Sequence, residues 1–66
     1  MTLGKLLELM DDHQRVEIII TESDGRTGYP WINRARDYKH VKFMEDIVIT
    51  DISASDDRII IEAKET

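Results

Sequence analysis

The chain has 66 residues, a formal net charge of −5 and no cysteine. A domain of this size buries only about 60% of the surface that its unfolded chain exposes, and neither a disulfide nor a thiolate metal site can add stability here. The excess of acidic residues argues against general nucleic-acid binding through a broad basic face. No apolar run approaches the length that a bilayer span requires, so we expect no membrane insertion.

The N-terminal residues show the spacing of a short amphipathic helix. Apolar side chains recur at i, i+3, i+4 and i+7 in Leu3, Leu6, Leu7 and Met10, directly after Thr2, a suitable N-cap. A helix of about eight residues is not stable alone in water. We therefore expect it to lie on a sheet.

A β-branched segment follows the helix. Residues 15–22, RVEIIITE, predict a strand, and Asp24-Gly25 is typical of a tight turn. The partner strand is expected over residues 26–32. Gly28 and Pro30 weaken that strand, because glycine packs nothing and proline cannot donate to a ladder, so it should be an edge strand or an irregular arm.

A second hairpin is predicted from residues 47–53 and 58–64, IVITDIS and RIIIEAK. Between the hairpins, Asn33 is a possible helix cap, and the following residues show no clean period. We expect a loop there with at most one short helix near residues 39–44. The sequence thus predicts one α+β domain over residues 1–66: a short N-terminal helix packed on a small antiparallel sheet of about four strands, with an irregular basic and aromatic insert.

Four aliphatic residues are predicted to point away from the face that carries the larger isoleucine set: Ile19, Val48, Ile52 and Ile60. The chain offers no further amphipathic segment to cover them. A small core also gains stability from self-association. We therefore expect a homo-oligomer in which a second subunit covers this face.

The insert of residues 26–44 concentrates positive charge and aromatic rings. It holds five of the nine Lys and Arg residues, the only Trp and both Tyr, against the single acid Asp37. Guanidinium groups match phosphate oxygens bidentately, and aromatic faces stack on bases. We predict a ligand-binding set of Arg26, Tyr29, Trp31, Arg34, Arg36, Tyr38, Lys39, His40 and Lys42. Within it, Arg34, Arg36 and Lys39 would hold phosphate, while Tyr29 and Trp31 would stack on a base.

Two other interpretations stay open. Trp31 and Tyr38 also suit a core or a subunit interface, where Trp, Tyr and Arg are enriched. The acidic residues, in turn, could imitate the phosphates of a nucleic acid and dock on a basic protein, or they could simply keep strand edges soluble. The chain has no cysteine nucleophile and its serines have no adjacent histidine pattern, so we do not expect an enzyme. It also lacks the ligand spacing of a structural metal site or a calcium loop, so we expect neither a metal nor a cofactor.

The succession of LGKLLELM, RVEIIITE and DIVITDISASDDRIIIEAKE resembles small proteins encoded by bacteriophages and prophages of Gram-positive bacteria. This resemblance implies an accessory protein in the cytoplasm of the bacterial host, of a kind that often inhibits bacterial defence. Our first hypothesis is an anti-defence protein that sequesters an anionic, nucleotide-type signalling ligand at a cleft between subunits. The alternative is an acidic inhibitor, anti-CRISPR-like, that binds a host defence enzyme or nuclease.

Overall fold

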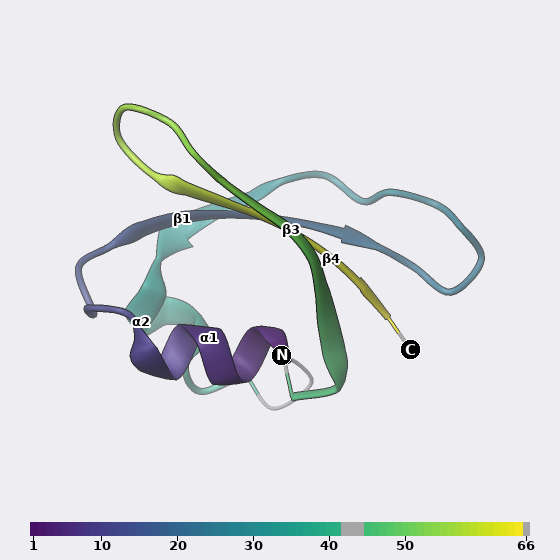
Figure 1. Cartoon of the computed structure of the whole chain (residues 1–66), viewed down its shortest axis with the longest axis horizontal. Helices are drawn as coiled ribbons and strands as arrows, with labels where there is room; N and C mark the ends of the chain where they lie inside the picture. Colours follow the sequence, from purple (N-terminus) through teal and green to yellow (C-terminus); the bar gives the residue numbers. More distant parts are fainter. Residues whose placement is uncertain (42–44, 66) are drawn as a thin grey trace.

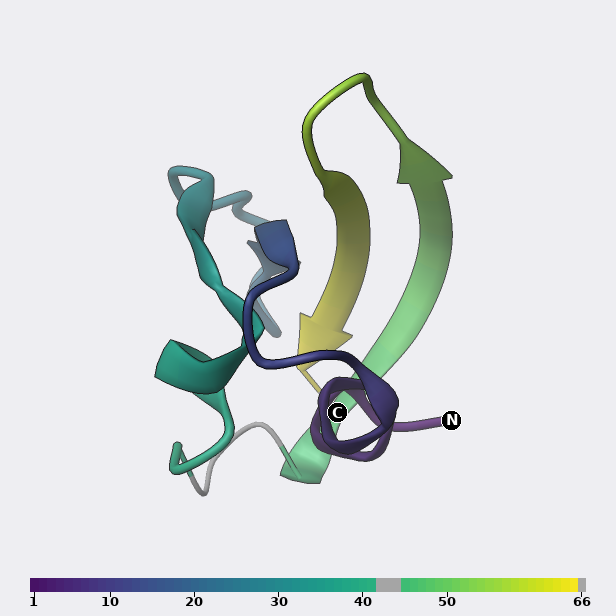
Figure 2. The ribbon, with the colours of Figure 1, turned by 90° about the vertical axis from the view of Figure 1, so that its left-hand side faces the viewer.

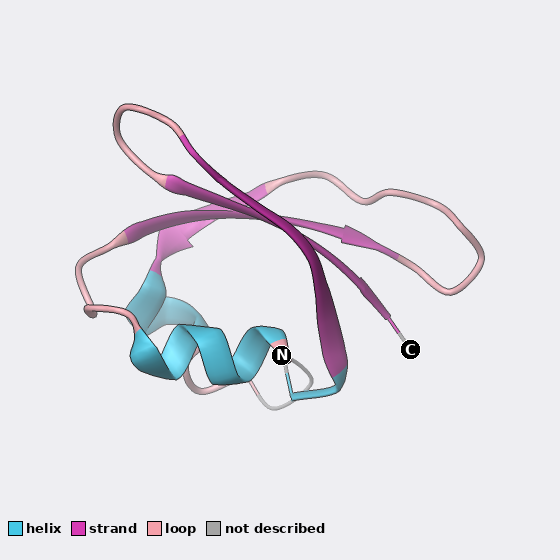
Figure 3. Cartoon of the chain, viewed as in Figure 1, coloured by secondary structure: helices cyan, strands magenta, loops and turns pink. Residues whose placement is uncertain are grey.

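The computed structural model describes residues 1–41 and 45–65 and shows an α+β fold of one sheet and two helices. Helix α1 (Leu3–Leu9) is followed by β1 (Arg15–Thr21), β2 (Trp31–Arg34), the short helix α2 (Ala35–Tyr38), β3 (Ile47–Ala54) and β4 (Ile59–Glu65), as Figure 1 shows. Both helices lie on the same side of the strands (Figure 3). The predicted class, the N-terminal helix and the count of four strands are confirmed.

The four strands form one sheet in the order β2-β1-β4-β3. The pairs β1–β2 and β3–β4 are antiparallel, as the two predicted hairpins require. The central pair β1–β4 is parallel, from Val16 opposite Ile59 to Thr21 opposite Lys64. The sheet is therefore mixed, which corrects the prediction of an antiparallel sheet. Each hairpin places its more apolar strand, β1 or β4, at the centre of the sheet, where both faces of a strand can be buried. The parallel direction could not be predicted, because the alternation of side chains is the same for parallel and antiparallel strands.

Helix α1 forms as its sequence predicts. The Thr2 hydroxyl accepts a hydrogen bond from the Lys5 N–H at 3.2 Å, and Leu3 and Leu7 are fully buried. The helix ends at Leu9, where the Met10 N–H donates to the Leu7 carbonyl. Packing of this one apolar stripe against the sheet stabilises a helix that is too short to persist alone.

The connection between β1 and β2 departs from the predicted strand over residues 26–32. The Asp24-Gly25 turn does form: Gly25 has a φ of +89°, and the Asp24 carboxylate accepts from the Arg26 N–H at 2.9 Å. Pairing then continues through the bridge between Thr21 and Thr27, where the Glu22 N–H donates to the Arg26 carbonyl at 2.7 Å and the Gly28 N–H donates to the Ile20 carbonyl at 3.0 Å. Regular pairing resumes at Trp31, after the proline. Residues 22–30 thus form an arm that extends past the end of β1 (Figure 1).

The second helix lies earlier than predicted. Helix α2 occupies Ala35–Tyr38, directly after β2, and the Asp37 carboxylate accepts from the Arg34 N–H at 3.2 Å. Asn33 is therefore in β2 and is not the cap. Residues 39–41 are not helical, and residues 42–44 lie outside the described residues. Burial determines the position of α2. Ala35 and Tyr38 are three residues apart, so a helical turn places both side chains on one face, and both are buried in the core.

The core lies between the helices and one face of the sheet. Its buried residues are Leu3, Leu7, Val16, Ile18, Ala35, Tyr38, Ile47, Ile61 and Ala63. The predicted inward sets of β1 and β4, which include Ile18 and Ile61, are confirmed. In the described part of the chain, neither helix has the length and apolarity that crossing a bilayer requires.

The opposite face of the sheet carries four aliphatic residues that neither described helix covers (Figure 3): Ile19, Ile32, Val48 and Ile60, here called the open face. Ile52 does not belong to it, which corrects the sequence prediction. A bulge between Ile49 and Asp51 shifts the register and pairs Ile52 with Ile61, on the core side. Ile52 is still half exposed, because it is close to the end of β3 that leads into the β3–β4 turn, and Figure 2 shows this end of the strand far from α1.

One ion pair crosses the open face. The Arg58 guanidinium donates to the Glu17 carboxylate at 2.9 Å, and both side chains are largely buried. This pair joins the residue directly before β4 to β1, and it adds a polar contact to a parallel strand pair held otherwise by its ladder and apolar packing.

Candidate functional site

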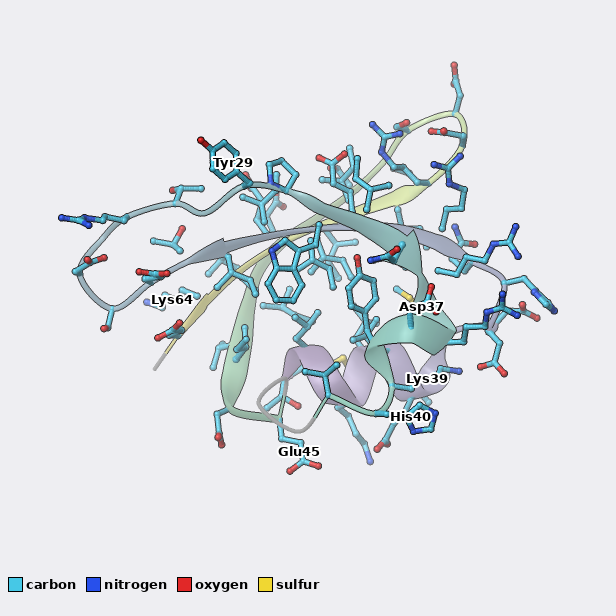
Figure 4. The ribbon with its side chains drawn as sticks, turned by 180° about the vertical axis from the view of Figure 1, so that it is seen from behind. Tyr29, Asp37, Lys39, His40, Glu45 and Lys64 are labelled. Atoms are coloured by element: carbon cyan, nitrogen blue, oxygen red, sulfur yellow. The ribbon has the colours of Figure 1, made fainter. Side chains whose placement is uncertain are left out.

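The predicted ligand-binding residues do not form a single site. Arg26 and Tyr29 lie in the arm, Trp31 and Arg34 in β2, Arg36 and Tyr38 in α2, and Lys39 and His40 in the turn after α2; Lys42 lies outside the described residues. In Figure 4, Tyr29 stands on the opposite side of the molecule from Lys39 and His40. The described members of the set therefore lie in several separate environments.

Three arginines line the first environment. Arg15, Arg34 and Arg36 surround a polar hollow of about 360 Å³, together with Ile32, Asn33 and Asp37, and we call it the arginine hollow. Pairing of β1 with β2 places Arg15 opposite Arg34. Helix α2 follows β2 without a loop and adds Arg36 two residues later.

Backbone hydrogen bonds fix the position of α2 beside the chain before β1. The Ala35 N–H donates to the Gln14 carbonyl at 2.8 Å, and the Arg36 N–H donates to the Asp12 carbonyl at 3.2 Å. The arginines of the hollow therefore project from elements whose relative position is set by the backbone. Such a rigid base favours a defined binding geometry for the flexible guanidinium groups.

The arginine hollow has an excess of positive charge. Arg15 contacts Asp57 at 3.5 Å through two exposed side chains, a weak interaction in water. Among the described residues, no ion pair involves Arg34 or Arg36. Of the described residues that line the hollow, Asp37 alone is acidic, and its carboxylate already accepts from the Arg34 N–H. Guanidinium groups gathered in this way match the oxygens of a phosphate or carboxylate.

Arg15 was not predicted from the sequence. It stands outside the basic insert, and its only signal is its place at the start of β1. Only the strand register brings it opposite Arg34. A prediction from composition along the chain cannot supply that information.

Lys39 was predicted to hold phosphate, but in the structure its side chain contacts other residues of the chain. Its ammonium donates to the Met10 carbonyl at 2.7 Å and to the Asp12 carboxylate at 2.6 Å, and its side chain is 22% exposed. The hydrogen bond and charge of Lys39 lower the pKa of Asp12 below its ordinary value of 3.8. Lys39 therefore ties the end of α1 to the turn after α2, and it does not line the arginine hollow. His40 follows it and is exposed (Figure 4).

Tyr38 belongs to the core and not to a ligand surface, which corrects its predicted role. Its side chain is 2% exposed, and its hydroxyl donates to the Val16 carbonyl at 3.5 Å. Burial raises the pKa of the Tyr38 phenol above its ordinary value of 10.0. The interpretation of Tyr38 as a core aromatic is the one that the structure supports.

The other two aromatic residues of the predicted ligand-binding set, Tyr29 and Trp31, line a separate cavity of about 230 Å³, here called the aromatic pocket. Its other lining residues are Ile20, Glu22, Gly28 and Glu65. Trp31 pairs with Ile18 and so shares the core side of the sheet, whereas Arg34 pairs with Arg15 on the opposite side. Among the described residues, none lines both cavities. The rings predicted to stack on a base and the arginines predicted to hold phosphate are therefore apart.

The remaining cation of the predicted set is engaged within the arm. The Arg26 guanidinium lies 3.4 Å from the Asp24 carboxylate, and both side chains are largely exposed. Arg26 thus lines neither the arginine hollow nor the aromatic pocket. In residues 1–41 and 45–65, no group of three His, Cys, Asp or Glu side chains is placed to hold a metal ion.

Comparisons with known proteins find no family model, no curated protein and no solved structure that matches this chain.

Proposed function

We propose that this protein is a small, non-enzymatic binding protein that captures a phosphate-bearing, nucleotide-type ligand in the arginine hollow. One observation carries the proposal: Arg15, Arg34 and Arg36 line a single hollow, and Arg34 and Arg36 form no ion pair with the described residues. Like charges held close together are unfavourable, and an anion between them removes that cost.

The size and lining of the arginine hollow support a ligand whose anionic group is the main contact. Its volume of about 360 Å³ lies within the range of about 300 to 1,000 Å³ that is common for small-molecule sites. Trp31 lines the other cavity, so a base would rest on Ile32 at the rim and not on the tryptophan. The anionic groups of the ligand, rather than aromatic stacking, would provide most of the affinity.

A homo-oligomer is part of the proposal. Ile32 lines the arginine hollow and also belongs to the open face, where its side chain is 43% exposed. A second subunit packed on the open face would therefore stand beside the hollow and turn it into a cleft between subunits. The anti-defence role, in which a signalling nucleotide is held away from its receptor, rests on the resemblance to phage proteins.

Calorimetry tests the proposal. Cyclic dinucleotides, ADP-ribose and inorganic pyrophosphate are titrated into the wild type and into the double variant Arg34→Ala with Arg36→Ala. Each hydrogen bond to a charged group contributes about 1.5 to 3 kcal/mol, so the double variant should bind at least about tenfold more weakly. Arg26→Ala is the matched control, because Arg26 is exposed in the arm. Equal affinity of the double variant and the wild type would reject the site.

The alternative, an acidic inhibitor of a host protein, is favoured by one further observation. Asp51 lies directly opposite Glu62 on the side of the sheet that carries the open face, and neither forms an ion pair with the described residues. Like charges in opposed positions are unfavourable, and a basic partner surface would offset them.

The two functions give different results in the same preparation. For the alternative, a host protein co-purifies with the wild type, and Asp51→Asn with Glu62→Gln abolishes the co-purification. For the proposed function, the same double variant keeps the affinity for the nucleotide, and the thermal shift with that nucleotide is unchanged.

A further inference from the structure

The aromatic pocket has a charge opposite to that of the arginine hollow. Its lining combines the rings of Tyr29 and Trp31 with the carboxylates of Glu22 and Glu65, and none of the cationic side chains in residues 1–41 and 45–65 contributes to it. Tyr29 is 91% exposed and Trp31 44%, so the aromatic surface is accessible to a ligand. Carboxylates at this position repel a phosphate and attract a cation.

The parallel pairing of β1 with β4 explains why two carboxylates meet there. The register ends at Thr21 opposite Lys64, and the next residues along the two segments, Glu22 and Glu65, both line the pocket. Lys64 alternates to the other face, because Ala63 is buried in the core and neighbouring residues of a strand point to opposite sides. In the part of the chain that the structure describes, neither Glu22 nor Glu65 forms an ion pair. Adjacent like charges on neighbouring strands are destabilising, and a bound cation would remove that cost.

The cavity is small and partly apolar. Its volume of about 230 Å³ is below the range of about 300 to 1,000 Å³ that is typical of sites for drug-sized molecules. Ile20 and Gly28 add an apolar and uncharged part to the lining. A strongly hydrated metal ion gains little from such a lining, whereas an organic cation contacts both the aromatic rings and the carboxylates.

We infer that the aromatic pocket binds a single organic ammonium group, held by the carboxylates of Glu22 and Glu65 and by the aromatic faces of Trp31 and Tyr29. An alkylated ammonium fits best, because its methyl groups lose little hydration when they contact the rings. The group can belong to a free quaternary amine or to a methylated lysine side chain, and the two sources share this chemistry. The site is independent of the arginine hollow.

The experiment follows Trp31 fluorescence, the signal of the only tryptophan, while tetramethylammonium, choline or Nα-acetyl-trimethyllysine amide is titrated into the full chain. The uncharged control ligand is 3,3-dimethylbutan-1-ol, which has the shape of choline without its charge. A saturable change with the ammonium compounds and none with the alcohol supports the inference. Tighter binding of choline indicates a free amine, and tighter binding of the lysine derivative indicates a side chain.

Three variants locate the ammonium site. Glu22→Gln with Glu65→Gln should weaken binding by at least about tenfold, because the two neutral amides no longer attract the charge of an ammonium group that has no N–H to donate. Tyr29→Ala should weaken it about two- to fivefold, as expected for a cation–π contact at an exposed site, while Tyr29→Phe keeps the affinity. Tyr29 is highly exposed, so its replacement leaves the fold intact.

Matched controls and contrary results complete the test. Glu8→Gln removes an acid from α1, outside the pocket, and should leave the affinity unchanged, as should the Arg34→Ala, Arg36→Ala variant. Equal binding of the uncharged alcohol overturns the inference, because charge would then play no part. The absence of a saturable signal with every ammonium compound overturns it as well.

Discussion

Tyr38 and Tyr29 have opposite environments although they are close in the sequence. Tyr38 is 2% exposed and bonds to the Val16 carbonyl, whereas Tyr29 is 91% exposed in the arm. The difference arises from local structure, because Tyr38 stands on α2 three residues after the buried Ala35. Burial also raises the pKa of the Tyr38 phenol, so the stability of the folded protein should depend on pH in the range where this phenol ionises.

This pKa shift predicts a loss of stability at high pH. The folded state favours the neutral phenol of Tyr38, so its contribution is fully present below the ordinary pKa of 10.0 and is lost as the pH rises through the raised value. Between pH 9 and pH 11 (about the range in which a tyrosine titrates), the free energy of unfolding of Tyr38→Phe should therefore fall less than that of the wild type. Urea denaturation at a series of pH values measures this difference.

Tyr29→Phe is the matched control for the pH series and should follow the wild type. At neutral pH, Tyr38→Phe should lower the free energy of unfolding by less than about 1 kcal/mol. The hydrogen bond that it removes is weak, because its donor–acceptor distance of 3.5 Å is at the upper end of the hydrogen-bond range. Parallel pH profiles of the wild type and Tyr38→Phe would show that the phenol does not contribute in this way.

At the residue scale, sequence reasoning found the charges but not their grouping. Arg34 and Arg36 were predicted correctly to lie close together, since only one residue separates them. Arg15 was missed, because only the strand register brings it opposite Arg34. Trp31 was grouped with the arginines by proximity in the chain, but alternation along β2 places it on the other side of the sheet from Arg34.

At the scale of single elements, the arm contains two glycines that both have space for a Cβ but differ in backbone conformation. Gly25 has a φ of +89°, in the region that L-residues rarely adopt, and a Cβ there would meet no atom within 4 Å. Gly28 has ordinary backbone angles, and its added Cβ would contact only the Ile20 carbonyl at 3.8 Å. The cost of replacing Gly25 is therefore purely one of backbone conformation.

Gly25→Ala should lower the free energy of unfolding by about 1 to 2 kcal/mol, the usual cost of a left-handed conformation for a residue with a Cβ. Gly28→Ala is the matched control, and a change within about 0.5 kcal/mol is expected there, as for other substitutions without a special mechanism. Thermal or urea denaturation of both variants gives the two values. If Gly28→Ala were the more damaging substitution, the described conformation of the turn would be wrong.

The predictions of secondary structure were wrong where strand direction or tertiary burial determines the structure. The N-terminal helix, observed over Leu3–Leu9, and the second hairpin were confirmed, because apolar spacing and turn residues encode them locally. The first hairpin was confirmed only in its antiparallel pairing, because its second strand is Trp31–Arg34 and not residues 26–32. The parallel pairing of β1 with β4 was not predicted, since alternation fixes the face of a strand but not its direction. The position of α2 depends on burial of Tyr38, a tertiary effect that the irregular pattern of the insert does not reveal.

At the scale of the whole molecule, the open face is the main unsatisfied surface. Ile19, Ile32, Val48 and Ile60 lie on the side of the sheet without helices, and a chain of 66 residues has little core to compensate. We propose that a second copy covers this face, as in the homo-oligomer described above.

Ile32→Lys tests the oligomer. Ile32 is 43% exposed, so the protomer should tolerate the charge, whereas a subunit interface should not. Light scattering coupled to size exclusion should show an oligomer for the wild type and a monomer for Ile32→Lys. Leu9→Lys is the matched control, since Leu9 is 71% exposed on α1, and it should leave the oligomer intact. A monomeric wild type at all accessible concentrations would contradict the expectation.

The most direct test of the central claim is to map inorganic pyrophosphate onto the protein by two-dimensional ¹H–¹⁵N NMR. We predict that the largest shift changes fall on the backbone amides of residues 33–36 and on the guanidinium signals of Arg15, Arg34 and Arg36, which line the arginine hollow. Changes centred on the residues of the aromatic pocket, or no saturable change at all, would contradict the proposed anion site.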